Sequence, residues 1–101
     1  MKISVIIPCY NEEQTILKII RSVQEYLKGD EYEIIIVDDA SKDNSIKLIE
    51  KHSRNDRNIE IISHEHNSGK GSAIRTGFIA ATGDLVVIQD ADLEYDPSEF
   101  G

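Results

Sequence analysis

Apolar residues along the chain fall into four short runs, separated by longer stretches in which apolar and polar residues recur at helical spacing. The runs lie at Ile3–Ile7, Glu33–Val37, Ile59–Ile62 and Leu85–Ile88. They are rich in β-branched residues and apolar nearly throughout, which is typical of strands covered on both faces. Strands that alternate with helices predict right-handed βαβ units and therefore a parallel sheet.

Local signals set the expected ends of these elements. Pro8 is expected to stop the first strand, and Asn11 then has the chemistry of a helix cap, with Gln14 completing a capping box. Gly29 is the expected stop of that helix. Asp43 is the expected cap of the second helix.

Polar residues follow three of the predicted strands, at Pro8–Glu12, Asp38–Asp39 and Asp90–Glu94. Doubly wound sheets bind ligands at the carboxyl ends of their strands, in the crevice where the strand order reverses. With the order 3-2-1-4, the first and fourth strands are neighbours at that crevice. We therefore predict an α/β fold with a doubly wound, mostly parallel sheet of this order, helices on both faces, and a ligand site at the strand ends.

Three acids follow the fourth strand at alternate positions: Asp90, Asp92 and Glu94. Side chains two apart on an extended chain point to the same side, so the three carboxylates can face one small volume. Such a cluster favours a cation, and Mg²⁺ or Mn²⁺ prefers carboxylate and phosphate oxygens. The pattern predicts a metal site that holds a phosphorylated ligand; the alternative is a solvated acidic turn.

Composition excludes several classes of protein. The 101 residues suffice for one domain, with 40% hydrophobic and 30% charged residues. A net charge of −8 argues against binding nucleic acid or an anionic membrane by bulk electrostatics. No apolar run approaches the length of a membrane span. A single cysteine, Cys9, and a first strand that begins at the N-terminus without a signal peptide lead us to expect a cytoplasmic protein.

Two other motifs are less specific. Gly69-Lys70-Gly71-Ser72 lacks the first glycine of a phosphate-binding loop, so it is either a turn into a helix or a helix N-terminus whose amides and Lys70 meet a phosphate. His64 and His66 are interpreted as loop histidines because neither a cysteine nor a third histidine is near. Of Asp38 and Asp39, one is expected to cap the next helix and the other to accept hydrogen bonds from a sugar hydroxyl.

Four blocks of the sequence form a pattern that is specific when taken together: Ile6-Ile7-Pro8-Cys9-Tyr10-Asn11-Glu12-Glu13, Val37-Asp38-Asp39-Ala40-Ser41-Lys42-Asp43, Asn67-Ser68-Gly69-Lys70-Gly71-Ser72-Ala73-Ile74-Arg75-Thr76-Gly77 and Gln89-Asp90-Ala91-Asp92-Leu93-Glu94-Tyr95-Asp96-Pro97. In this order, the blocks resemble the N-terminal half of the GT-A-fold, family-two glycosyltransferases. The resemblance covers essentially the whole chain, and the blocks look most like those of dolichyl-phosphate and polyprenyl-phosphate sugar transferases.

The resemblance implies roles for individual residues. Pro8, Tyr10 and Glu12 would line the nucleoside pocket, with Val37 beside the base and Asp39 on the base or ribose. Asp90, Ala91 and Asp92 form the family's Asp-x-Asp motif, in which Asp92 is the expected direct metal ligand and Asp90 supports the metal or the sugar. Relatives often carry Gln where this chain has Glu94, which leaves open whether that residue ligates the ion.

The implied chemistry is sugar transfer with inversion from a GDP- or UDP-sugar to an acceptor. A Mg²⁺ or Mn²⁺ ion would stabilise charge on the departing nucleoside diphosphate. A lipid phosphate acceptor, dolichyl or polyprenyl, is already anionic and needs no strong base, whereas a saccharide hydroxyl requires a carboxylate base.

Family members continue well beyond residue 101, so we expect residues 1–101 to be the nucleotide-sugar-binding half of a longer, truncated domain. Alone it is expected to lack transferase turnover, and its unfinished sheet edge favours self-association. The parent protein is expected at the cytoplasmic face of a membrane.

Two rival functions use the same features. A nucleotide-diphosphate-binding module would employ the same residues without catalysis. A phospho-acceptor receiver domain has a similar length and sheet, but by resemblance its acid pair follows the first strand, where this chain has Pro8-Cys9-Tyr10-Asn11. The acid cluster after the fourth strand therefore disfavours a receiver.

Overall fold

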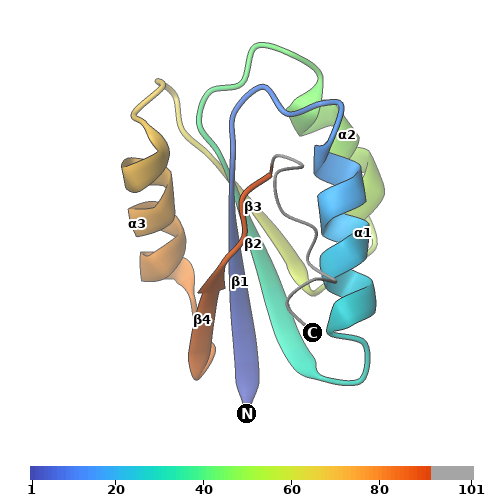
Figure 1. The fold of residues 1–101 in the computed structure, drawn as a ribbon. Helices are drawn as coiled ribbons and strands as arrows, with labels where there is room; N and C mark the ends of the chain where they lie inside the picture. The colour runs from blue at the N-terminus through green and yellow to red at the C-terminus, as the bar shows by residue number, and fades with distance from the viewer. Residues whose placement is uncertain (92–101) are drawn as a thin grey trace.

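The computed structural model describes residues 1–91, which form a parallel four-stranded sheet with helices on both faces (Figure 1). The strand order is β3-β2-β1-β4, as the sequence predicts. In chain order the elements are β1 (Lys2–Cys9), α1 (Ile16–Tyr26), β2 (Glu31–Asp38), α2 (Ser45–Ser53), β3 (Ile59–Ser63), α3 (Lys70–Ala80) and β4 (Leu85–Ile88).

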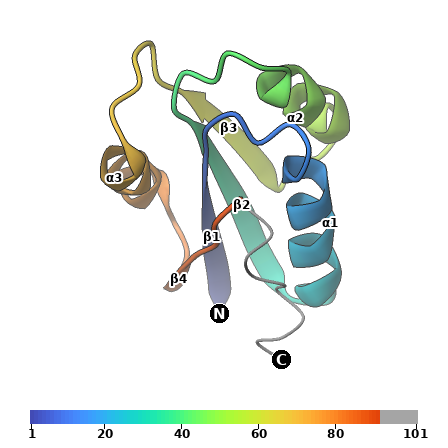
Figure 2. The same ribbon diagram turned by 45° about the horizontal axis from the view of Figure 1, so that its top comes forward.

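The sheet separates two unequal layers of helices. α1 and α2 cover one face and α3 covers the other, as both views show (Figures 1 and 2). Because neighbouring residues of a strand point to opposite faces, β2 serves both layers. Ile34 and Ile36 pack in the larger core with α1 and α2, whereas Ile35 and Val37 pack on the α3 side.

Small residues bring α3 close to the sheet. Ala73 and Gly77 are its buried residues. A Cβ added at Gly77 would lie only 2.5 Å from Cγ2 of Ile6 in β1. Close packing at this point holds α3 directly against β1.

Pro8 does not end the first strand, contrary to the sequence-based expectation; it lies inside β1, in register with Val37 of β2. Backbone groups of alternate β1 residues face opposite neighbours: Ile6 O accepts from Gln89 N on the β4 side, and Cys9 O accepts from Asp39 N on the β2 side. Pro8 therefore faces the side of β4, where the ladder has already ended, and its missing N–H costs no pairing.

The predicted capping box is also wrong. Asn11 has a φ of 52°, and its side-chain oxygen accepts a hydrogen bond from Lys42 N. α1 begins only at Ile16, after Thr15, which makes no side-chain cap bond to the helix backbone. Asparagine tolerates the left-handed conformation, so Asn11 turns the chain and ties it to the next strand-end loop.

β4 pairs with β1 and with no other strand in the part of the chain that the structure describes. Its side chains Leu85, Val87 and Ile88 are all exposed by more than 40%. Within residues 1–91, no helix has the length and apolar character needed to cross a membrane.

Candidate functional site

A cavity of about 250 Å³ opens at the carboxyl ends of the strands. Residues that end or follow β1, β2 and β4 contribute to it, together with the loop before α3 and the first turn of that helix. The sequence-predicted convergence of strand ends is thus seen in the structure. The cavity is lined by Pro8, Cys9, Tyr10, Glu12, Asp39, Asn67, Gly69, Lys70, Ala73, Asp90 and Ala91.

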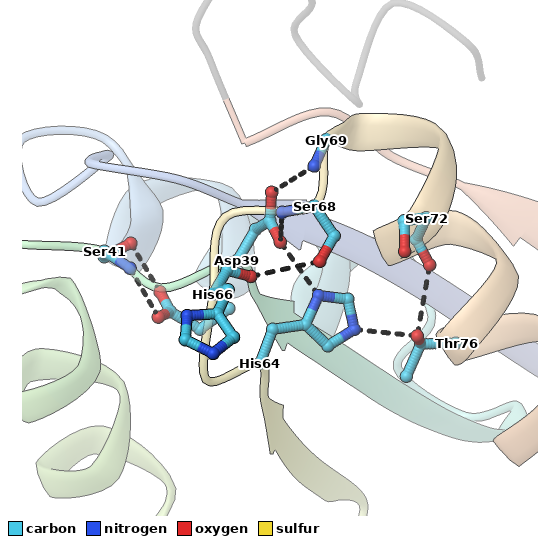
Figure 3. A network of polar contacts seen from close by, with 9 residues as sticks. Asp39, Ser41, His64, His66, Ser68, Gly69, Ser72 and Thr76 are labelled. Carbon is cyan, nitrogen blue, oxygen red and sulfur yellow. Dashed lines mark hydrogen bonds and ion pairs between the residues drawn. The ribbon is translucent and has the colours of Figure 1, made fainter.

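Asp39 is the most heavily bonded acid of the cavity (Figure 3). It is buried, and its Oδ1 accepts hydrogen bonds from His64 Nδ1 at 2.8 Å and Ser68 N at 2.9 Å, while Oδ2 accepts from Gly69 N at 2.8 Å. Burial on its own raises the pKa of this carboxyl, but the bonds from Ser68, His64 and Gly69 outweigh it and lower the pKa. Asp39 is therefore an ionised anchor for the loop before α3.

Asp38 and Asp39 divide their roles differently from the sequence-based expectation, because neither caps α2. Asp38 accepts from the N–H of Ser41 at 3.0 Å and from its hydroxyl at 2.6 Å, which closes a turn after β2. The first N–H of α2, on Ser45, is bonded instead by Oδ1 of Asp43 at 2.9 Å. The N-cap of α2 is Asn44, one residue after the predicted Asp43, and Asp43 supports the start of the helix through its bond to Ser45 N.

The loops after β1 and β2 hold each other in place. Asn11 N donates to Ser41 Oγ at 2.9 Å, Glu12 N to Ser45 Oγ at 3.0 Å, and Glu13 N to Asp43 Oδ2 at 3.1 Å. Three successive backbone donors of the loop after β1 are therefore satisfied by side chains from the loop after β2 and from the first residue of α2. These hydrogen bonds hold the two loops together and keep Tyr10 and Glu12 at the mouth of the cavity.

The segment after β4 contributes another acid, Asp90, to the lining of the cavity. The strand ends at Ile88, and Asp90 then forms an ion pair with Lys70 at the first turn of α3. Asp92 and Glu94, the other predicted metal ligands, lie outside the described residues. Among residues 1–91, no three His, Cys, Asp or Glu side chains are grouped so that they could hold a metal ion.

Val37 and Cys9 are placed differently with respect to the cavity. Val37 is fully buried and packs with Ile35 and Ala73, so it does not line the cavity. Cys9 does line it, but burial and the nearby charge of Asp38 raise the pKa of its thiol to about 12. The thiol is therefore protonated at neutral pH, in keeping with a packed residue rather than a nucleophile.

Asn67, Gly69 and Ala73 also line the cavity, and His64 contacts it through Asp39. Sequence reasoning treated His64 as an ordinary loop residue. The signal that identifies it is its position directly after β3, at the same sheet edge as the other site residues, because strand ends of a parallel sheet meet there.

The sequence model of glycosyl transferase family 2 matches residues 4–101. This chain belongs to that family. A curated relative, the undecaprenyl-phosphate 4-deoxy-4-formamido-L-arabinose transferase of Proteus mirabilis (strain HI4320), is 43% identical over 102 residues, which cover 98% of this chain and 31% of that protein. The family-2 chain thus spans about a third of the length of this relative.

Solved structures agree on the GT-A, Rossmann-like fold of this family-2 chain. TarS 1-349 of S. aureus in complex with UDP-GlcNAc has a TM-score of 0.83 and 35% identity, with 91% of this chain and 27% of that chain covered. The mannosyltransferase PcManGT of Pyrobaculum calidifontis, in complex with GDP-Man and Mn²⁺, has a TM-score of 0.79 and 28% identity, with 89% and 27% covered.

A third solved relative is also in complex with Mn²⁺. Glucosyl-3-phosphoglycerate synthase of Mycobacterium tuberculosis, in complex with Mn²⁺, UDP and glucosyl-3-phosphoglycerate, has a TM-score of 0.73 and 32% identity. The alignment covers 90% of this chain and 33% of that one. Relatives of this family-2 chain thus include proteins in complex with UDP-GlcNAc and with GDP-Man.

Proposed function

We propose that residues 1–101 form the nucleotide-sugar-binding part of a metal-dependent glycosyltransferase that transfers a sugar with inversion to an acceptor. The observation that carries the proposal is the cavity in which Asp39 and Asp90, from the ends of β2 and β4, share one lining with the first turn of α3. Membership of glycosyl transferase family 2 names the chemistry that such a cavity serves.

The donor nucleotide would occupy this cavity. Asp39 accepts a hydrogen bond from the base or ribose, while Pro8, Tyr10 and Glu12 form the wall contributed by β1. The diphosphate would lie toward the start of α3, where backbone N–H groups and Lys70 supply positive potential. Support comes from the relatives in complex with UDP-GlcNAc and GDP-Man.

The donor set at the cavity fits a divalent cation. Asp90 lines the cavity and forms an ion pair with the Lys70 ammonium. Its carboxylate therefore already interacts with a positive charge at this position. We propose that Asp90 binds Mg²⁺ or Mn²⁺ together with Asp92 and Glu94. When bound, the ion supplies Lewis-acid stabilisation of the departing nucleoside diphosphate. Two relatives in complex with Mn²⁺ support this assignment.

For the acceptor, the proposal favours a polyprenyl phosphate. It is supported by the 43% identical relative, whose name specifies an undecaprenyl phosphate. A lipid phosphate oxygen is already anionic, so the reaction would need no strong base from this chain. The parent protein would then work at the cytoplasmic face of a membrane.

A saccharide hydroxyl is the alternative acceptor and would require a carboxylate base. A second candidate function is nucleotide-diphosphate binding without turnover, which would use the same cavity.

Calorimetric titration of UDP, GDP and their sugars, with and without Mn²⁺, tests the proposal. We expect one nucleotide family to bind, with affinity that rises when Mn²⁺ is present and falls in Asp90→Asn. Absence of binding for every nucleotide would contradict the proposed function. Sugar transfer by residues 1–101 alone, abolished in Asp92→Ala, would contradict the expectation that this part lacks turnover.

A further inference from the structure

His64 connects the cavity to the middle of α3 (Figure 3). Its ring lies between Asp39 and Thr76, with Nδ1 2.8 Å from Asp39 Oδ1 and Nε2 2.8 Å from Thr76 Oγ1. The backbone of His64 is fixed as well, because its N–H donates to Asp38 O at 2.9 Å. His64 is therefore held at three points, two on the ring and one on the backbone, although it does not line the cavity itself.

Counting protons fixes the role of one ring nitrogen. The pKa of Asp39 is lowered, so its carboxylate is ionised and can only accept hydrogen bonds. Nδ1 of His64 must therefore carry a proton and donate it. In a neutral imidazole this makes Nε2 the acceptor, and the hydroxyl of Thr76 must then donate to it.

The hydroxyl of Thr76 has a second partner, the carbonyl oxygen of Ser72 at 3.1 Å. If His64 becomes charged, Nε2 donates to Thr76 and the hydroxyl turns its single proton to Ser72. Both arrangements keep the same heavy-atom positions. The bond from Nδ1 to Asp39 consequently persists whether His64 is neutral or charged.

The bonds to Asp39 leave little of its carboxylate unused. A carboxylate has about four acceptor positions, two on each oxygen. Oδ1 already accepts from His64 and Ser68, whereas Oδ2 accepts from Gly69. The remaining position belongs to Oδ2, and Asp39 lines the cavity.

We propose that His64 is a positioning residue for nucleoside recognition, which donates from Nδ1 to Oδ1 of Asp39 and so keeps the remaining acceptor position of Oδ2 toward the cavity. An N–H or O–H donor of the nucleoside would use that position. This inference rests on the proposed function for the identity of the ligand. The bond from His64 to Asp39 is independent of it.

The state of the ring is measured on the ligand-free chain. The sequence has three histidines, so ¹⁵N-labelled histidine gives few ring signals, and those of His64 are identified by their loss in His64→Asn. At a pH where the ring is neutral, we expect the tautomer protonated at Nδ1. A tautomer protonated at Nε2 would leave no donor for Asp39 and would overturn the inference, whatever the chain binds.

Nucleotide titration tests the consequence. The side-chain amide of Asn can replace Nδ1 as a donor, so His64→Asn should bind UDP or GDP, with Mn²⁺, nearly as the wild type does. His64→Ala lacks the donor and should bind about tenfold more weakly. His66→Ala changes an exposed histidine of the same loop and should have no effect.

The outcomes separate the two proposals. A wild-type chain that binds no nucleotide contradicts the proposed function, while the tautomer still decides the bond to Asp39. A wild-type chain that binds, with His64→Ala binding equally well, overturns the positioning role and leaves the proposed function standing. A folded His64→Asn that binds as weakly as His64→Ala also overturns it. If His64→Ala does not fold, His64→Asn and the tautomer decide.

Discussion

The hydroxyl of Thr15 donates a hydrogen bond of 2.6 Å to the carbonyl oxygen of Ala91 and so joins the residue before α1 to the segment after β4. The two residues are 76 positions apart in the chain. Ala91 is buried, and it follows Asp90 directly. The residue before α1 therefore anchors the segment after β4 at Ala91, next to Asp90.

Replacing Thr15 with valine tests this anchor. Thr15→Val keeps the shape of the side chain but leaves the carbonyl of a buried residue without its donor, which should reduce the free energy of unfolding by about 1–3 kcal/mol. Urea denaturation measures this, and Mn²⁺-dependent nucleotide binding should weaken in parallel. Thr15→Ser retains a hydroxyl and should stay close to wild type. An unchanged Thr15→Val would show that the bond does not fix the segment.

Gly77 and Gly71 lie in the same helix, and we expect alanine substitutions at the two positions to have opposite effects on stability. In Gly77→Ala the new Cβ meets Ile6 at 2.5 Å, so we expect a loss of about 1–3 kcal/mol despite the better helix propensity of alanine. Nothing lies within 4 Å of a Cβ at Gly71, and Gly71→Ala should be neutral or stabilising by up to about 1 kcal/mol. Thermal and urea denaturation compare the pair; equal effects would contradict the close packing of α3 on β1.

Acid should destabilise the chain in part through Asp39. Its pKa is lower in the folded chain than in the unfolded one, so its ionised form stabilises the fold above the unfolded pKa of about 4. That contribution is lost as the pH falls through the lower, folded value. Melting temperatures measured from about pH 6 to pH 3 should fall for the wild type. They should fall less steeply in Asp39→Asn, which starts from lower stability because its NH₂ group faces a neighbouring N–H donor. Parallel curves would contradict this assignment.

Lys70 and a divalent ion should compete for Asp90. Without nucleotide, Lys70→Met should bind Mn²⁺ more tightly, by about fivefold at most, because partly exposed ion pairs contribute little. With Mn²⁺ present, the same variant should bind UDP or GDP less well, since the diphosphate loses a positive neighbour. Lys70→Arg keeps the charge and serves as the control. Calorimetry measures both titrations; identical Mn²⁺ affinity in Lys70→Met and wild type would exclude the competition.

The sequence predicted the sheet because its apolar runs and their spacing repeat four times, and the strand order brought the acids after β2 and β4 to one edge. Prediction from the sequence failed where a residue contacts a partner that is distant in the chain. Asn11 has the chemistry of a cap but bonds to Lys42, and Pro8 continues β1 because the neighbouring ladder has ended. Val37 fits the family's base pocket by position, but its burial depends on the packing of Ala73 of α3, which no local pattern encodes.

The most direct test of the account is the place where the metal binds. Mn²⁺ is paramagnetic and broadens the amide signals of nearby residues in the ¹⁵N-labelled chain. With UDP or GDP present, we predict selective loss of the signals of Tyr10, Gly69 and Asp90 at the cavity, while Glu31 and Asp84, at the opposite ends of the strands, remain sharp. Broadening centred on Glu31 and Asp84, or equal along the whole chain, would contradict a shared metal and nucleotide site at the carboxyl ends of the sheet.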